Sequence, residues 1–382
     1  MTPRSLFVLS NEHGQLGFAL TLLRGQRFAD GALVLLPDAL MKENRGTLPV
    51  RADSYRSISE VRVHADEHRP EVVFFLSGHG VTGDASLDQR ALQRLVSALH
   101  AGGCRVVTSD PLLGLGRALT LADVDPRMGT IKHAAGKRWL LRVLLRLQGR
   151  NTRAARLPAF EDSTHIYPMA VASGESTVAI ASVFNRSIVR ESVKKRDRAT
   201  WLFLLTPDEA ACQIALIGER ELLRNLVGLA RYTTEVGRTA TVIAPAPIVE
   251  RLASLAPGAG TYLPPCSAVE FEQRLLESEY TFYWGAFAFS QLVRLANGLP
   301  FFLFDRGWFA RTMAPFYSRA VSWYFGGREP SYVDQRQLYS PYVLAHLAEQ
   351  QQAAHQALLN RWQRLPTPDE LVERLVYSAL AT

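Results

Sequence analysis

The sequence predicts an α/β protein with two doubly wound parallel sheets and a helical C-terminal tail. Short apolar, β-rich runs alternate with amphipathic helical segments over the first ~120 residues, as in a parallel sheet covered by helices on both faces. The alternation blurs after that and restarts near residue 200. The length of 382 residues suits two domains, and a hydrophobic content of 47% supplies apolar material for two cores.

In the first half, four apolar runs are predicted as strands, with amphipathic segments between them as helices. The strands are 5–10, 32–37, 71–77 and 104–109. The helices are 16–25, 57–70 and 87–103, and the last two end at Pro70 and at a pair of glycines. Two more runs, 164–174 and 176–184, are candidate strands.

The second half shows the most regular alternation. Its predicted strands are 200–206, 239–245, 261–265, 280–285 and 300–305, and its helices are 220–237, 247–258, 267–279 and 289–298. Right-handed crossovers between such strands build a doubly wound sheet, whose ligands bind beyond the carboxyl ends of the strands. We therefore predict Rossmann-like domains at 1–195 and 196–330, with a helical tail at 331–382 that packs across them.

Composition narrows the functional classes. The net charge of +7 suits an anionic ligand or surface. Recognition modules for nucleic acid are missing from the sequence, so no nucleic-acid partner is expected. Cys104, Cys212 and Cys266 lie far apart without metal-ligand spacing, which favours a reducing cytoplasm. Neither a signal peptide nor a run long enough to span a membrane is recognisable.

The segment 263–307, "LPPCSAVEFEQRLLESEYTFYWGAFAFSQLVRLANGLPFFLFDRG", resembles the nucleotide-sugar-binding half of GT-B-type glycosyltransferases. In both, a proline-bearing strand leads through a helix and a strand to a small-residue loop, a helix ending in Gly-x-Pro and a further strand. The resemblance implies two Rossmann-like domains facing a central cleft. It also implies transfer of a sugar from a nucleotide-diphosphate sugar to an acceptor, without a metal ion or another cofactor. The sequence departs from the family at Val293, where many members have an acidic residue, and Gly285 lies earlier than the usual glycine.

A turn of small residues before a helix suits a diphosphate, because the backbone N–H groups at a helix N-terminus attract anions. This turn would be formed by Gly285, Ala286, Ala288 and Ser290, with Ser290 also as the N-cap. The alternative is a capped helix of an ordinary α/β domain.

Further donor-binding residues follow from the resemblance and from neighbouring charges. In the family, the loop at Pro265 lies near the base, and the loop after the last strand touches the sugar. Asp305 would hold sugar hydroxyls and Arg306 would neutralise the leaving diphosphate, unless the two form only an exposed turn. Arg220, in "GERE", is a further donor candidate or part of a solvated helix face.

The acceptor would be activated from the first half. His13 follows the first strand, and a histidine suits removal of a proton from a hydroxyl, unless it is an ordinary loop residue or a cap. Glu12 is its substitute. Asp110 and His79 follow other strands of the same sheet, although Asp110 equally suits a turn before Pro111.

Several alternatives stay open from sequence alone. The basic helix 137–150 either contacts an anionic membrane at its inner face or packs on the core with a solvated arginine edge. A hydrolysing nucleotide-sugar epimerase shares the fold. The third possibility is a non-catalytic GT-B-like binding protein, which is favoured by Val293 in place of the family's acidic residue. The sugar, nucleotide base, acceptor, stereochemical course and oligomeric state do not follow from the sequence.

Overall fold

The computed structural model describes residues 2–10, 13–76, 89–109, 160, 163–167, 180–190, 199–285, 288–304, 325, 331–333 and 340–377. The chain divides into two compact units. Unit 1 consists of 1–188, 322–326 and 361–382, and unit 2 of 189–321 and 327–360. The domain boundaries predicted after residues 195 and 330 fall on segments outside the described residues.

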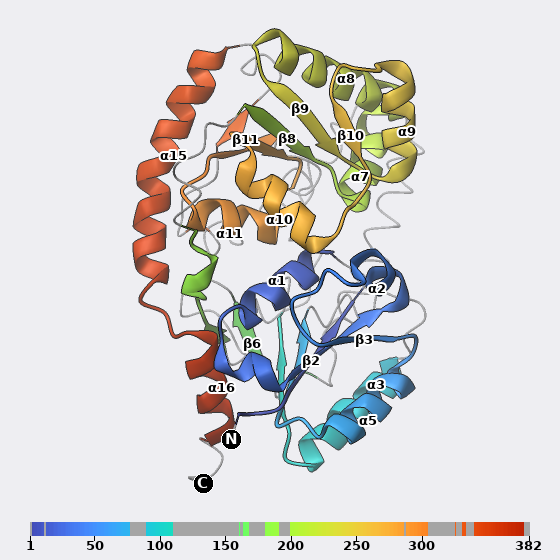
Figure 1. The fold of residues 1–382 in the computed structure, drawn as a ribbon, viewed down its shortest axis with the longest axis vertical. Coiled ribbons are helices and arrows are strands. Elements are labelled where there is room, and N and C mark those ends of the chain that lie inside the picture. Colours follow the sequence, from blue (N-terminus) through green and yellow to red (C-terminus); the bar gives the residue numbers. More distant parts are fainter. Residues whose placement is uncertain are drawn as a thin grey trace, which may run out of the picture. The chain divides into compact units, whose positions relative to one another are not determined.

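Unit 1 is built on a parallel sheet of order β3-β2-β1-β4-β5-β6-β7 (Figure 1). The strands are β1 Ser5–Leu9, β2 Ala32–Pro37, β3 Ala52–Tyr55, β4 Val72–Leu76, β5 Arg105–Thr108, β6 Thr164–Tyr167 and β7 Ile180–Ser182. Every predicted strand of this half is confirmed. β3 was not predicted, because its sequence ADSY lacks an apolar run and only Tyr55 is buried.

Helices cover the sheet of unit 1. They are α1 His13–Leu23, α2 Asp38–Asn44, α3 Ile58–His68, α5 Gln89–Ala101 and α16 Pro368–Tyr377, with 3-10 helices η1 Arg27–Gly31 and η4 Arg186–Ile188. α3 and α5 pack on one face of the sheet. α16 is held to η1, since the Asp369 carboxylate accepts the backbone N–H groups of Arg27 and Phe28.

Unit 2 repeats the architecture with the order β10-β9-β8-β11-β12-β13. The strands are β8 Thr200–Leu204, β9 Thr239–Ile243, β10 Thr261–Leu263, β11 Tyr280–Tyr283, β12 Phe301–Phe304 and β13 Tyr332–Val333. The helices are α7 Pro207–Ile217, α8 Glu219–Glu235, α9 Ala246–Leu255, α10 Ala268–Glu277 and α11 Phe289–Ala296. All described strand pairs are parallel, so the predicted fold class, two doubly wound α/β sheets, is confirmed.

The core of unit 2 is aromatic. Phe203, Phe282 and Phe304 on neighbouring strands stack on one face of the sheet, with the Phe203 and Phe282 ring centroids 4.8 Å apart. α8 and α9 pack against this face, while α10 and α11 contact each other (Figure 1). Such stacking adds to the hydrophobic free energy of burial and fixes the positions of the strand ends.

One helix of unit 2 was not predicted. The sequence pattern predicts no helix between the strand 200–206 and the helix 220–237, but Pro207 begins α7. Thr206 and Glu209 form a capping box, in which each side chain accepts the other residue's backbone N–H. The spacing Thr-Pro-x-Glu is the sequence signal for this helix start.

The helical tail is confirmed as α15 Pro341–Trp362 and α16. Residues 341–360 of α15 belong to unit 2, where the Gln351 side chain pairs with both backbone groups of Phe301 at the start of β12. One turn further on, the His355 ring stacks on Phe301 at a centroid distance of 5.4 Å. α15 therefore holds the amino end of β12.

The buried His355 should make the folded protein less stable at acidic pH. Burial lowers the pKa of His355 from 6.5 to about 4, and the nearby charge of Arg294 adds to the effect. As the pH falls below 6.5, this histidine takes up a proton in the unfolded chain, whereas in the folded chain it does so only near pH 4. The group therefore leaves the free energy of unfolding unchanged above pH 6.5 and lowers it by about 3 kcal/mol as the pH drops to 4. Urea unfolding across this range should show the loss in wild type and in the exposed-site control His346→Gln, and a flatter profile in His355→Gln.

Candidate functional site

The strand order of unit 2 reverses between β8 and β11. The chain goes from β8 outward to β9 and β10, and then crosses back to β11 on the other side of β8. In doubly wound sheets this switch point, at the carboxyl ends of the strands, is where ligands bind. The two strands lead directly into Thr206 and Gly285, so both residues lie at this edge.

Gly285 is in close contact with the first turn of α7. A Cβ atom added to Gly285 would lie 2.1 Å from Oε1 of Glu209. The other carboxylate oxygen, Oε2, accepts the backbone N–H of Thr206 at 2.9 Å. Glycine is therefore favoured here by close approach, since a larger residue would displace the carboxylate that caps α7.

Gly285→Ala is expected to lower the free energy of unfolding by about 1 kcal/mol, the usual cost of losing a helix cap. The added methyl group would push aside the Glu209 side chain, which is flexible at its far end. A double-mutant cycle with Glu209→Ala, measured by urea unfolding, checks the cause. The cost of Gly285→Ala should largely disappear in the Glu209→Ala background, and an undiminished cost would contradict this account.

The helix after the loop begins at Phe289, as predicted, but its N-cap differs from the prediction. α11 spans Phe289–Ala296 with Ala288 as its N-cap, which makes no side-chain capping bond. The prediction that Ser290 is the N-cap is therefore wrong, because Phe289 already has helical geometry. Ser290 lies beside the buried Tyr283, whose pKa is raised by burial, with Ser290 as the largest opposing influence. Gln291, fully buried, donates from Nε2 to the Gly285 carbonyl at 2.6 Å.

The remaining donor-side predictions fall in different places. Pro265 is exposed in the loop between β10 and α10. Val293 is buried, so this position of α11 faces the core. Ala286, Asp305 and Arg306 lie outside the described residues.

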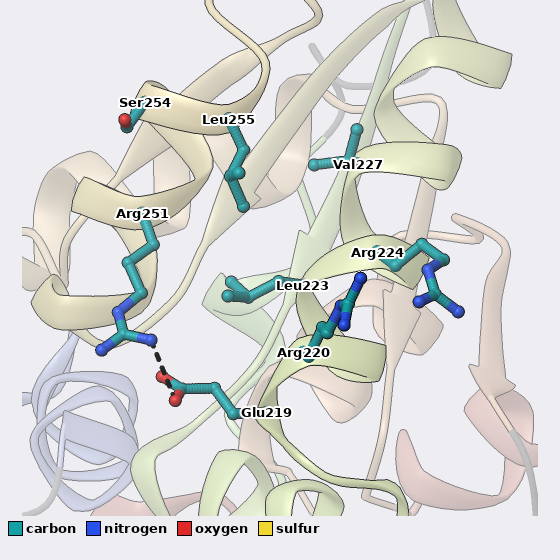
Figure 2. A pocket seen from close by; sticks show the side chains of 8 residues that line it. All are labelled: Glu219, Arg220, Leu223, Arg224, Val227, Arg251, Ser254 and Leu255. Carbon is teal, nitrogen blue, oxygen red and sulfur yellow. Dashed lines mark ion pairs between the residues drawn. The ribbon is translucent and has the colours of Figure 1, made fainter.

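Arg220 lies on the helical layer of unit 2. Figure 2 shows it on α8, where it lines a groove of about 580 Å³ between α8 and α9. The groove also contains Arg251, paired with Glu219 at 2.9 Å, and Arg224, paired with Glu221 at 2.5 Å. Apolar side chains of both helices, Leu223, Val227 and Leu255, form the rest of its lining. Arg220 is thus an exposed cation in a surface groove.

In unit 1, His13 is the first residue of α1, after β1. Its Nε2 lies 2.6 Å from Oε2 of Glu43 on α2, and both side chains are nearly half exposed. A carboxylate only accepts hydrogen bonds, so Nε2–H donates to Glu43, and in the neutral ring this tautomer leaves the lone pair on Nδ1. This arrangement suits a general base that is oriented by a carboxylate. Glu43 was not predicted as a site residue. It follows β2, which lies beside β1 in the sheet, so the segments after the two strands meet at the same edge, and this placement was the available signal.

Other predictions for the first half are outside the described part of the chain. Glu12, His79, Asp110 and the basic helix 137–150 all fall on segments without a described placement. In the segments that the structure does describe, no helix is both long and apolar enough to cross a membrane. The same segments contain no group of three or more His, Cys, Asp or Glu side chains arranged to hold a metal ion.

The two doubly wound sheets and the helical tail give this chain the GT-B fold. Its overall structure is similar to the spinosyn rhamnosyltransferase SpnG complexed with thymidine diphosphate, with a TM-score of 0.51 and 15% identity over 97% of this chain and 99% of that one. The spinosyn forosaminyltransferase SpnP gives a TM-score of 0.54 and 14% identity over 100% of both chains. Phytolacca americana UGT2, complexed with UDP-2-fluoro-glucose and pterostilbene, gives 0.53 and 12% identity over 99% and 100%. No protein-family profile and no curated protein sequence matches the chain.

Proposed function

We propose that this chain is a metal-independent glycosyltransferase, which moves a sugar from a nucleotide-diphosphate sugar to an acceptor hydroxyl or similar nucleophile. The observation that carries the proposal is the end-to-end similarity to GT-B glycosyltransferases, of which SpnG holds thymidine diphosphate and UGT2 a UDP-sugar analogue. The contacts of Gly285 at the switch point of unit 2 support it locally.

The donor would bind at unit 2. Its diphosphate would lie against the loop 285–288 and the N-terminus of α11, where the small side chains of Gly285, Ala286, Ala288 and Ser290 suit the close approach of an anion to the backbone. Arg306, directly after β12, would neutralise the charge that develops on the leaving diphosphate, and Asp305 would hold sugar hydroxyls. Pro265 would lie near the base.

The acceptor would be activated by His13. As the acceptor oxygen forms its bond to the anomeric carbon, the bond from that carbon to the diphosphate oxygen breaks, and Nδ1 of His13 takes the acceptor proton. The Glu43 carboxylate stabilises the imidazolium that results, since it already accepts a hydrogen bond from Nε2. This course inverts the configuration of the sugar carbon.

Thermal unfolding with a panel of UDP, TDP, GDP, ADP and CDP tests the proposal. A diphosphate present at about 100 times its dissociation constant should stabilise the protein by about 2.7 kcal/mol. Stabilisation by one or two members, together with release of that diphosphate from its sugar donor, supports a transferase. Stabilisation without turnover across a set of acceptor classes would indicate a binding protein, and no stabilisation by any member would contradict the proposal.

A further inference from the structure

The groove between α8 and α9 has an apolar floor that is partly open to water (Figure 2). Leu223 of α8 is almost fully buried at its base, whereas Leu255 at the end of α9 is 57% exposed. Val227, one turn after Leu223, is partly buried and also lines the groove. A leucine exposed on its own is ordinary, but apolar side chains that line a groove between two helices form a surface that a partner segment can cover.

The cations of the groove lie at one end of this floor. α8 and α9 each lead into a strand of the same parallel sheet, so the two helices run in the same direction. Arg220 precedes Val227 by seven residues on α8, and Arg251 precedes Leu255 by four residues on α9. The groove is therefore charged where the two helices enter it and apolar one to two turns further on.

One of these cations is uncompensated. Arg251 pairs with Glu219 at 2.9 Å, and Arg224 pairs with Glu221 at 2.5 Å. Arg220 is exposed and has no ion pair or hydrogen bond with another residue of the described part of the chain. Three arginines against two glutamates leave one excess positive charge, on a planar guanidinium whose geometry matches a carboxylate.

The mixture of charge and apolar surface favours a protein segment as the occupant. A nucleic-acid backbone would be repelled by the two glutamates and would leave the apolar floor uncovered. A membrane surface does not fit into a hollow between two helices. A second copy of this chain carries the same net charge of +7, which opposes self-association. An amphipathic helix with a carboxylate one or two turns from its apolar side chains matches both ends of the groove.

We propose that the groove between α8 and α9 is a docking site for an acidic amphipathic helix of a partner protein. A carboxylate of that helix pairs with Arg220, and its apolar side chains cover Leu223, Val227 and Leu255. The inference goes beyond the proposed function, because the groove contains none of the residues to which that function assigns the donor or the acceptor. It can therefore be tested without an assay for sugar transfer.

Selection of a displayed library of short random peptides on the immobilised full chain tests the inference. Wild type should enrich peptides that combine Asp or Glu with Leu, Ile or Phe at helical spacing. Their affinities, measured by fluorescence anisotropy, should fall about tenfold in Arg220→Glu, as expected for the loss of a charge-assisted pair. Arg94→Glu is the matched control, since Arg94 is exposed on α5 of unit 1 and its replacement changes the net charge equally. It should leave the affinities unchanged.

Two features keep the test decisive. Arg220→Glu should fold, because an acidic residue in the first turn of a helix is favourable. Leu255→Ser keeps every charge and should weaken the same peptides severalfold, through the loss of apolar contact.

The inference is overturned if no acidic peptide is enriched, or if the enriched peptides bind Arg220→Glu and Leu255→Ser as tightly as wild type. Phosphatidylserine vesicles and single-stranded RNA serve as the polyanion probes. Binding of either that is lost in Arg220→Glu but kept in Leu255→Ser would also overturn it, in favour of a polyanion.

Discussion

Replacing His13 by alanine is expected to lower the turnover of sugar transfer by about 10²- to 10⁴-fold, the usual contribution of a positioned general base. The affinity for the nucleoside diphosphate should stay the same, because His13 belongs to unit 1 and the donor loop to unit 2. The measurement is steady-state release of the diphosphate in the presence of acceptor, with donor affinity determined separately by calorimetry.

Two further variants separate the base from the residue that orients it. Glu43→Gln keeps a hydrogen-bond acceptor near His13 but removes the charge, so turnover should fall by less than in His13→Ala. His64→Ala is the matched control, since His64 lies on α3 of the same unit and is 3.9 Å from Asp53. His64→Ala should retain wild-type turnover. Full turnover in His13→Ala would remove this residue from the mechanism.

Arg294→Met is expected to destabilise unit 2 by about 3–5 kcal/mol, the range for breaking a buried charged network. Arg294 is 0% exposed. Its guanidinium donates to the carbonyls of Leu275, Ser278, Glu279 and Pro300 and to the Ser278 hydroxyl. Methionine would fill the space but remove all five of these hydrogen bonds from a buried part of unit 2. The loss would be measured as the change in free energy of unfolding in urea.

Arg274→Met is the control for Arg294. Arg274 lies on α10 and is partly exposed, and its partner is Glu270, one helical turn away. Exposed pairs of this kind contribute about 0.5 kcal/mol or less, so the control should unfold nearly as wild type does. A loss below about 1 kcal/mol in Arg294→Met would show that the buried network is not what holds α10, α11 and β12 together.

The sequence predicted the sheets well because buried parallel strands are continuous apolar runs. The sequence-based predictions of secondary structure and burial were wrong where neighbours distant in sequence decide the conformation or burial of a segment. β3 is polar in sequence yet pairs with β2. Thr206 was predicted as the end of a strand, whereas it is the N-cap of α7, a helix that was not predicted. An arginine within a helix is usually solvated. Arg294 is buried because the end of α10 and the residues just before β11 and β12 surround it with carbonyl groups.

The candidate site was harder to predict, because its contacts join residues that are distant in sequence. Gly285 was predicted as part of a small-residue turn that a diphosphate can approach, and the structure adds that it packs closely against Glu209. His13 was predicted from its place after the first strand, but its partner Glu43 lies on α2, which follows the neighbouring strand β2. The bond from Gln291 to the Gly285 carbonyl had no sequence signal, since it joins a buried residue of α11 to the end of the preceding strand.

Hydrogen–deuterium exchange with and without a saturating nucleoside diphosphate reports where the ligand binds. If the donor binds at the switch point of unit 2, peptides covering 283–298, at the carboxyl end of β11 and the start of α11, should exchange more slowly. Peptides covering the groove between α8 and α9, where Arg220 lies, should exchange at unchanged rates. Protection confined to that groove, or unchanged exchange at 283–298 despite binding, would contradict the account.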